Sequence, residues 1–377
     1  MERFLHGLLQ DLERQCSTLR DHLATIATDR EVSFYAMTAY QKVERVRRKT
    51  LQLLADPDLD KPEILPNYLQ LYKRWNEEVR IVESYPFPFV ERYAESDRQI
   101  TRFCQRLAQQ VGWPLPAPLV ATFSHQYYWT VAEFNLICVP AIEGKMLLSQ
   151  PDLCHELGHI LLLAYKSLFV KEFLQALAKY IRQEQRRVKN EQRPSQYGPL
   201  YDHLLEQWTD AWLLEFVADM IATYLVGPAF GWQHLRLCMG NNQAIYHPGL
   251  GDTAEHPADE ARLRGIIAVL EQMGALEAKD QIRDLWDRYL TVCGETRPPD
   301  YEVCYPQSLI ELLARHVVKV CRSLDLRGFD QAQGFQGDIP SLLNEAWERF
   351  LANPQTYADW EHSQLEALWQ ELGTNQS

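Results

Sequence analysis

The feature that most constrains the fold of this chain is an apolar run, Leu153–Tyr165 (LCHELGHILLLAY), that contains two histidines and a glutamate. Residues four apart lie on one face of an α-helix, so His155 and His159 can hold a single metal ion. Glu156, between them, can act as a general base toward a metal-activated water. A chance match on a surface helix is the alternative. The apolar flanks argue against it, because buried polar groups need partners that a metal would supply.

The composition is typical of a globular protein and excludes some functions. The 377 residues are 46% hydrophobic and 24% charged, enough for two or three compact units. The net charge of −13 argues against a nucleic-acid partner, because phosphate binding needs a basic surface. The most apolar stretch, residues 211–232, carries Glu215 and Asp219, which favours a buried helix over a membrane span. The eight cysteines form no CxxC pair and no secretory signal is apparent, so we expect reduced thiols and a cytoplasmic location.

The hydrophobic periodicity predicts a mainly α-helical protein in three regions. We expect a helical N-terminal region (1–112), a zincin-like metalloprotease core (113–275) and a helical C-terminal region (276–377), with the proline-rich segment 113–118 at the first boundary. A heptad-like stripe near the N-terminus favours a helical hairpin within the monomer over a dimer. The stripe consists of Leu5, Leu9, Leu12, Cys16, Leu19, Leu23 and Ile26. Further helices are expected at Val32–Leu54, Tyr68–Glu83, Phe89–Val111, Ser167–Lys189, Tyr201–Val226, Ala258–Gln272, Lys279–Val292, Pro306–Leu324, Pro340–Leu351 and Trp360–Leu372.

A small β element is expected just before the histidine helix. Glu133–Ala141 is β-branched and aromatic and ends at a proline, which predicts a strand. The residues that follow look like a helix start, with Ser149 as the N-cap, Pro151 in the first turn and Asp152 in a variant of the capping box.

A catalytic zinc normally has three protein ligands and one open position, so a third ligand must lie further along the chain. Glu215 and Asp219 are four residues apart in an otherwise apolar helix, where unpaired carboxylates are costly. One of them could bind the metal while the other accepts the free N–H of a ligand histidine. A buried ion pair with an arginine or lysine is one alternative, and His203 as the ligand is another.

A downstream His-Pro pair offers another candidate. Pro257 suits the first turn of a helix, which puts His256 near a helix start and Arg262 about two turns on. A histidine brought to the metal could stabilise the oxyanion of a tetrahedral intermediate. A simple helix start explains His256-Pro257 equally, and His247-Pro248 repeats the pair without an arginine at the same offset.

Together these elements resemble the gluzincin metallopeptidases, and in particular the prenyl-protease and membrane heat-shock protease group, whose pattern is HExxH…ExxAD…HPxxxxR. The matching segments are residues 155–159 (HELGH), 215–219 (EFVAD) and 256–262 (HPADEAR). The resemblance covers roughly residues 130–270. Members of that group are embedded in the membrane, whereas this chain has no predicted span. Membrane location and prenylated substrates therefore do not carry over, and the chain looks like a soluble relative.

The resemblance also implies a role for each motif residue. It implies zinc as the cofactor, bound by His155, His159 and Glu215, with Glu156 as the base. It further implies that Asp219 supports a ligand and that His256 and Arg262 line the site.

The leading hypothesis is a zinc metallopeptidase, with an endopeptidase acting on a protein or peptide substrate favoured. The Glu133–Ala141 strand could pair with an extended substrate. One alternative is an inactive or regulated scaffold that acts by binding proteins, although an intact Glu156 weighs against it. In either case the N-terminal helices could receive a regulatory protein partner. A zinc hydrolase acting on a non-peptide amide is the other alternative.

Overall fold

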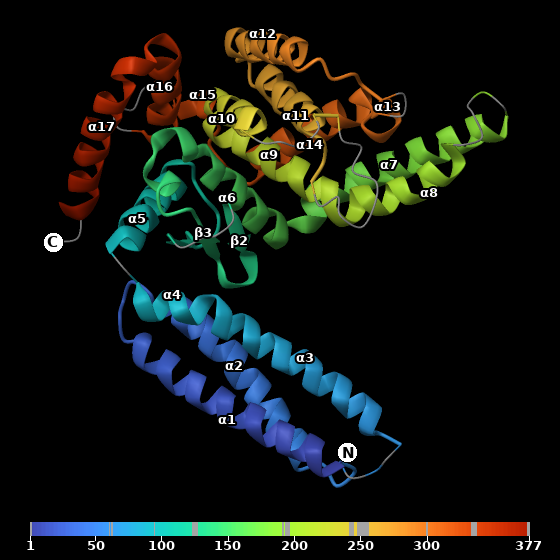
Figure 1. Ribbon diagram of the computed structural model, residues 1–377, viewed down its shortest axis with the longest axis vertical. Helices are drawn as coiled ribbons and strands as arrows, with labels where there is room; N and C mark the ends of the chain where they lie inside the picture. Colours follow the sequence, from blue (N-terminus) through green and yellow to red (C-terminus); the bar gives the residue numbers. More distant parts are fainter. Residues whose placement is uncertain are drawn as a thin grey trace. The chain divides into compact units, whose positions relative to one another are not determined.

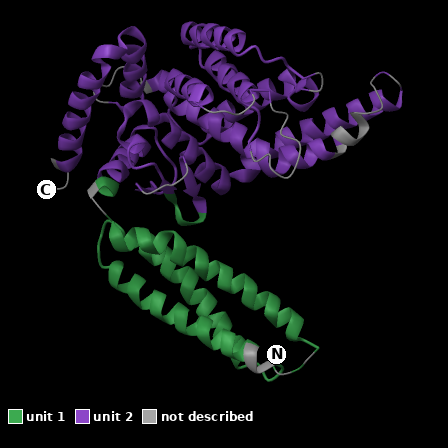
Figure 2. Cartoon of the chain, viewed as in Figure 1, with its two compact units in different colours: residues 1–98, 133–136 green, residues 99–132, 137–377 purple. Residues whose placement is uncertain are grey.

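The computed structural model describes residues 2–59, 61, 63–93, 95–122, 127–190, 192, 197–240, 245–246, 256–298, 301–332 and 338–374. The protein is mainly helical with one small sheet, as predicted (Figure 1). It forms two compact units (Figure 2), unit 1 with residues 1–98 and 133–136, and unit 2 with residues 99–132 and 137–377. The expected boundaries after residues 112 and 275 stay predictions.

Unit 1 is built around the α1–α2 helical hairpin. Its helices are α1 (Glu2–Ile26), α2 (Ser33–Leu54), α3 (Leu65–Ser84) and α4 (Pro86–Arg92), followed by the start of α5 (Glu95–Gln110). The stripe residues from Leu5 to Leu23 are buried and α1 packs on α2, as expected for a hairpin within the monomer. The single helix expected at Phe89–Val111 is wrong, because Tyr93, with φ of 13° and ψ of 77°, ends α4 before α5 begins.

The sheet of the protein is short and its strands are not in chain order. Strands β1 (Leu119–Ala121), β2 (Trp129–Val131) and β3 (Leu136–Cys138) are arranged β1-β3-β2. The strand predicted over Glu133–Ala141 is therefore shorter, and a 3-10 turn, η1 (Ala132–Phe134), occupies its expected first residues. Because β3 lies between β1 and β2, neither of its edges is open, and β2 is an edge strand.

Two apolar helices of unit 2 carry the sequence motifs. Helix α6 (Pro151–Ala164) contains the HELGH segment, and α9 (Leu213–Val226) contains EFVAD. The two helices are in close contact. A Cβ atom added to Gly158 would lie only 2.8 Å from the Cα atom of Ala218. Two short 3-10 turns, η2 (Glu143–Lys145) and η3 (Leu147–Ser149), precede α6.

The start of α6 differs from the prediction. Pro151 is in the first turn as expected, but the N-cap residue is Gln150 and its side chain makes no capping hydrogen bond. Ser149 Oγ instead accepts a hydrogen bond from Arg236 at 2.8 Å. The carboxylate of Asp152 accepts one from the Tyr127 hydroxyl at 2.5 Å. Both side chains are used for tertiary contacts, so neither caps the helix.

The helix expected over Tyr201–Val226 consists of three segments. Helix α8 (Tyr197–Gln207) leads into a π-helical turn, η4 (Trp208–Trp212), which continues into α9. Two fully buried tryptophans anchor this turn. Trp208 donates a hydrogen bond to the carbonyl of Cys304 at 3.0 Å and stacks on Phe216. The ring centroids of Trp212 and Tyr305 are 4.5 Å apart.

The remaining helices of unit 2 surround α6 and α9 (Figure 1). They are α7 (Lys166–Lys189), α10 (Pro228–Gly240), α11 (Asp259–Gln272), α12 (Leu276–Cys293), α13 (Tyr301–Cys304), α14 (Gln307–Ser323), α15 (Phe329–Ala332), α16 (Ile339–Ala352) and α17 (Pro354–Thr374). All eight cysteines fall within the described part of the chain and form no disulfide there; seven are buried and Cys293 is exposed. Among the described residues, none of the helices combines the length and apolar character needed to cross a membrane.

Candidate metal centre

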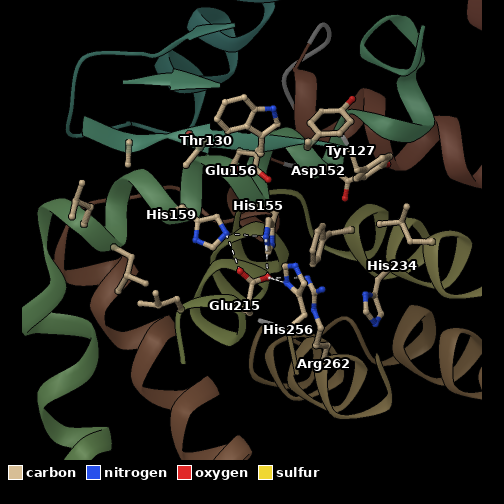
Figure 3. Close-up of a pocket in the computed structure, with 18 of the residues that line it drawn as sticks. Tyr127, Thr130, Asp152, His155, Glu156, His159, Glu215, His234, His256 and Arg262 are labelled. Atoms are coloured by element: carbon tan, nitrogen blue, oxygen red, sulfur yellow. Dashed lines mark hydrogen bonds and ion pairs between the residues drawn. The ribbon is translucent and has the colours of Figure 1, made fainter. Parts of the chain in front are cut away.

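Three donor atoms converge between α6 and α9 (Figure 3). The Nε2 atoms of His155 and His159 are 3.1 Å apart. Glu215 faces both, with Oε2 3.6 Å from His155 Nε2 and Oε1 3.4 Å from His159 Nε2. Zinc bonds of about 2.0–2.1 Å in a tetrahedron place neighbouring nitrogen or oxygen ligands about 3.3 Å apart. The observed separations are near that value, but the two histidines contact different oxygens of Glu215, so one oxygen would have to move toward both nitrogens to complete a tetrahedral zinc site.

Asp219 fixes the orientation of His155. Its Oδ1 atom lies 2.8 Å from His155 Nδ1, so an N–H at Nδ1 leaves the lone pair of Nε2 directed at the candidate metal position. Asp219 is completely buried and also receives two hydrogen bonds from Arg262, each 2.7 Å long. Burial alone would raise the pKa of Asp219, but Arg262 and His155 hold it well below its usual range.

The two histidines have opposite electrostatic environments. Burial lowers the pKa of His155, but the carboxylates of Asp219 and Glu215 outweigh burial and raise it to about 9. For His159, burial and the neighbouring His155 lower the pKa to about 4. Two ring nitrogens facing each other at 3.1 Å need a proton or another cation between them. A divalent metal ion would take the place of that proton.

Glu215 is an ionised carboxylate in a buried position. Burial opposes ionisation, yet His256, both motif histidines and Arg262 lower the pKa of Glu215 to about 2. Its Oε2 atom is buried and makes no hydrogen bond with the described residues, although His256 Nδ1 lies 3.0 Å away as an ion-pair partner. Coordination to a metal would give this buried carboxylate a further positive partner beside His256 and Arg262.

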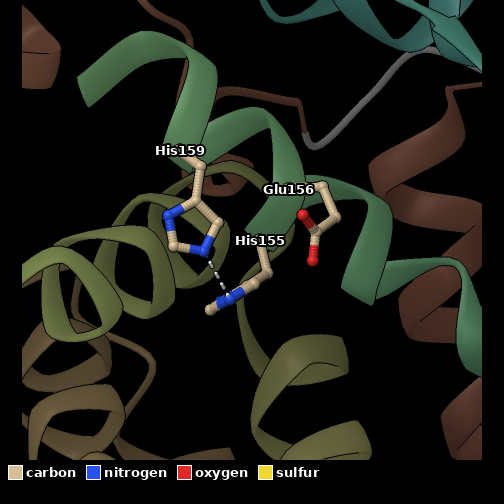
Figure 4. A group of neighbouring side chains, drawn as sticks. All are labelled: His155, Glu156 and His159. Atoms are coloured by element: carbon tan, nitrogen blue, oxygen red, sulfur yellow. Dashed lines mark hydrogen bonds between the residues drawn. The ribbon is translucent and has the colours of Figure 1, made fainter. Parts of the chain in front are cut away.

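Glu156 lies beside the histidine pair on α6 (Figure 4). One of its carboxylate oxygens and one ring nitrogen of each histidine lie within 4.8 Å of one another. Burial is the main cause that raises the pKa of Glu156, to about 8, and the carboxylates of Glu215 and Asp152 add to it. A carboxyl group with a raised pKa is suited to exchanging protons near neutral pH.

The site opens into a cavity of about 730 Å³ that contains every motif residue predicted for it except the fully buried Asp219. Its aromatic wall comes from Tyr127, Tyr128 and Trp129, at and just before the edge strand β2 (Figure 3). Apolar side chains form much of the remaining wall, namely Leu162, Leu163, Leu214, Phe230 and Leu237. The cavity can therefore receive an extended chain with apolar side chains.

Sequence reasoning missed a hydrogen-bonded group at the cavity wall. Asp152 is bonded to Tyr127 and to Gln233, and burial raises its pKa to about 6. No motif marks these residues, which lie on segments far apart in the chain, so contacts alone reveal them. His234, which also lines the cavity, was missed for the same reason, and Asp259 lies within the HPADEAR segment but was assigned no role.

The other candidates from the sequence lie elsewhere. His203 is on α8, is exposed and does not line the cavity, so it is not near the donor atoms. The ion-pair alternative holds for Asp219, which pairs with Arg262, while Glu215 faces the histidines. His256 lines the cavity with a side chain that is 59% exposed. His247 lies outside the described residues.

The chain matches no known protein family, no curated protein and no solved structure.

Proposed function

We propose that this protein is a zinc-dependent metallopeptidase of the gluzincin type, and that it acts as an endopeptidase on a protein or peptide. The observation that carries the proposal is the convergence of His155 Nε2, His159 Nε2 and the Glu215 carboxylate, with separations of 3.1 Å between the histidines and 3.6 and 3.4 Å from them to the two oxygens of Glu215. A general base next to these atoms and an adjoining cavity complete the requirements for hydrolysis.

In this proposal each polar side chain has a distinct task. His155, His159 and Glu215 hold the metal, which when bound supplies a Lewis acid that activates water and polarises a carbonyl group. Glu156 takes a proton from the attacking water and passes it to the leaving amine. Asp219 keeps His155 in the tautomer that leaves Nε2 free, since it accepts the Nδ1 proton at 2.8 Å.

His256 and Arg262 act on the periphery of the same group. Arg262 neutralises Asp219 through two hydrogen bonds and lies 3.8 Å from Glu215, so it holds both carboxylates in place. His256 contacts Glu215 at 3.0 Å, and its exposed ring faces the cavity. A protonated imidazole there would stabilise the oxyanion of a tetrahedral intermediate.

The substrate lies along β2 rather than along the segment expected from the sequence. The strand predicted at Glu133–Ala141 contains β3, which has a neighbour on each side and cannot add another strand. Strand β2 (Trp129–Val131) is at the edge of the sheet, and its residues Trp129 and Thr130 line the cavity. An extended peptide could lie along this part of the cavity with its side chains against the apolar walls.

The test combines metal analysis with peptide hydrolysis. Wild type should contain zinc and cleave members of a mixed peptide library, whereas Glu215→Ala should lose the zinc equivalent of this site together with activity. Glu156→Gln should keep zinc and lose turnover. Glu206→Gln, an exposed residue of α8 outside the cavity, is the matched control and should behave as wild type.

Two results would contradict the proposal. Hydrolysis that persists in Glu156→Gln would remove the base assignment. Zinc bound equally by wild type and Glu215→Ala would remove the ligand assignment. Zinc binding without hydrolysis of any peptide would favour the alternative, a scaffold that acts through protein binding.

A further inference from the structure

A second group of metal-ligand side chains lies at the wall of the same cavity. His234 and Cys238 are four residues apart on α10, so they share one face of that helix, and Asp259 is the first residue of α11. A ligand atom from each of the three lies within 4.8 Å of the others. Figure 3 draws His234 among the residues that line the cavity, and Asp259 also lines it.

The separation of the two donors on α10 fits a zinc ion. Cys238 Sγ and His234 Nε2 are 3.4 Å apart. With bonds of about 2.3 Å to sulfur and about 2.0–2.1 Å to nitrogen, a tetrahedral zinc places these ligands about 3.5 Å apart. The side chains of both residues are buried, at 3% exposure each, so they have few competing contacts with water.

The proposed peptidase uses none of these three residues, of which His234 and Cys238 are buried and Asp259 is half-buried. His234 Nε2 also donates a hydrogen bond to the main-chain oxygen of Asp259 at 3.0 Å, which holds α10 against the start of α11, and a zinc ion bound at Nε2 would replace that proton. Burial lowers the pKa of His234, which favours the neutral imidazole that metals bind. Asp259 and Asp219 add negative potential here, while Arg262 opposes it.

We propose that His234, Cys238 and Asp259 form a second zinc site with an open coordination position toward the cavity. Thiolate, imidazole and carboxylate are the ligand types that zinc prefers, and three protein ligands leave one position for water. Binding releases the thiol proton of Cys238 to solvent, so a dication meets one thiolate, one carboxylate and one neutral imidazole and the site becomes electrically neutral. The proposal does not depend on peptidase activity.

Cobalt substitution distinguishes the two sites, because only the second one contains sulfur. Cobalt(II) bound to a thiolate gives a ligand-to-metal charge-transfer band in the near ultraviolet, and a site of imidazole and carboxylate ligands gives none. Apoprotein loaded with cobalt should bind two equivalents and show the band. Cys238→Ser should bind one equivalent and lose the band, whereas Glu215→Ala should bind one equivalent and keep it.

The matched control is Cys293→Ser, which replaces an exposed thiol on α12 and should keep both the band and two equivalents. A second variant, Asp259→Asn, changes a half-buried residue rather than a buried thiol. It should weaken cobalt binding at the sulfur-containing site at least tenfold. The conclusion then does not depend on whether Cys238→Ser folds. A wild type without the band, or a band that survives in Cys238→Ser, would overturn the proposal. If wild type shows no band and Glu215→Ala still loses one cobalt equivalent, only the proposal of the second site is contradicted. The proposed peptidase site is unaffected by that result.

Discussion

Replacing Gly158 by alanine tests whether the metal centre depends on the close approach of α6 to α9. The added Cβ atom would meet the backbone of Ala218, 2.8 Å from its Cα and 3.0 Å from its carbonyl oxygen. Ordinary contacts begin near 3.4 Å, so the helices would have to separate by about 0.6 Å. Metal sites tolerate errors of only about 0.2 Å in ligand distances. The separation would therefore disturb His159 and Glu215, which lie on opposite helices.

Two energies of opposite sign set the size of the effect. Overpacking costs about 1–3 kcal/mol, and the upper end applies because the opposing atoms are backbone. Alanine gains about 1 kcal/mol over glycine in helix propensity. The net loss is about 2 kcal/mol, which corresponds to a decrease of about 4–8 °C in the unfolding midpoint for a unit of this size. We also expect zinc affinity to fall at least tenfold.

The assay is thermal unfolding together with zinc competition against a chromophoric chelator. Gly7→Ala is the matched control, because Gly7 lies on α1 and an added Cβ there meets no atom within 4 Å. That variant should gain up to about 1 kcal/mol in stability and keep its zinc affinity. If Gly158→Ala shows the unfolding midpoint and zinc affinity of wild type, the close approach does not position the ligands.

Three further predictions address the buried ion pairs and the metal. Asp219→Asn should destabilise the protein by about 3 kcal/mol in denaturant unfolding, because it leaves the Arg262 guanidinium buried without its carboxylate; a loss below 0.5 kcal/mol, on the order of a surface substitution, would contradict this. Hydrogen bonds from Arg47 are the main cause that lowers the pKa of Glu44 from 4.5 to about 2, with burial opposing them. Because the folded pKa is the lower one, this stabilisation is present above pH 4.5 and is lost as the pH falls toward 2. At pH 7 the free energy of unfolding of Glu44→Gln should therefore be about 1 kcal/mol lower than that of wild type. Calorimetry should show this difference vanish near pH 2. A difference that does not change with pH would refute its origin in the ion pair. Removing zinc with a chelator should lower the unfolding midpoint of wild type by more than that of Glu215→Ala, and equal decreases would place the stabilising metal elsewhere.

The parts of the site that follow from local helix geometry could be predicted from the sequence. His155 and His159 are four residues apart, as are Glu215 and Asp219, and a helix places each pair on one face. The motif order led to the expectation that the two pairs and Arg262 come together, and the distances agree with it. The ligand and catalytic roles stay predictions until metal and activity are measured.

Features set by tertiary contacts could not be predicted in the same way. Ser149 has the right residue type and position for an N-cap, but Arg236, 87 residues later, takes its hydroxyl group. The strand at Glu133–Ala141 had the right composition, yet strand order decides which edge is open, and no local pattern encodes that order. The sequence near Tyr93 likewise gave no turn signal strong enough to indicate the break between α4 and α5.

The π-helical turn at Trp208–Trp212 sets the rotational phase of the metal-binding helix. A π-turn closes its hydrogen bond one residue later than an α-turn, so it acts as a one-residue insertion within a continuous helix. If the same residues formed a regular α-helix without the π-turn, Glu215 would be rotated by about 100° relative to Tyr201, whose hydroxyl bonds to Glu184 on α7. The sequence spacing of residues that share one face is therefore shifted by one residue between the part of the helix that packs on α7 and the part that faces the histidines.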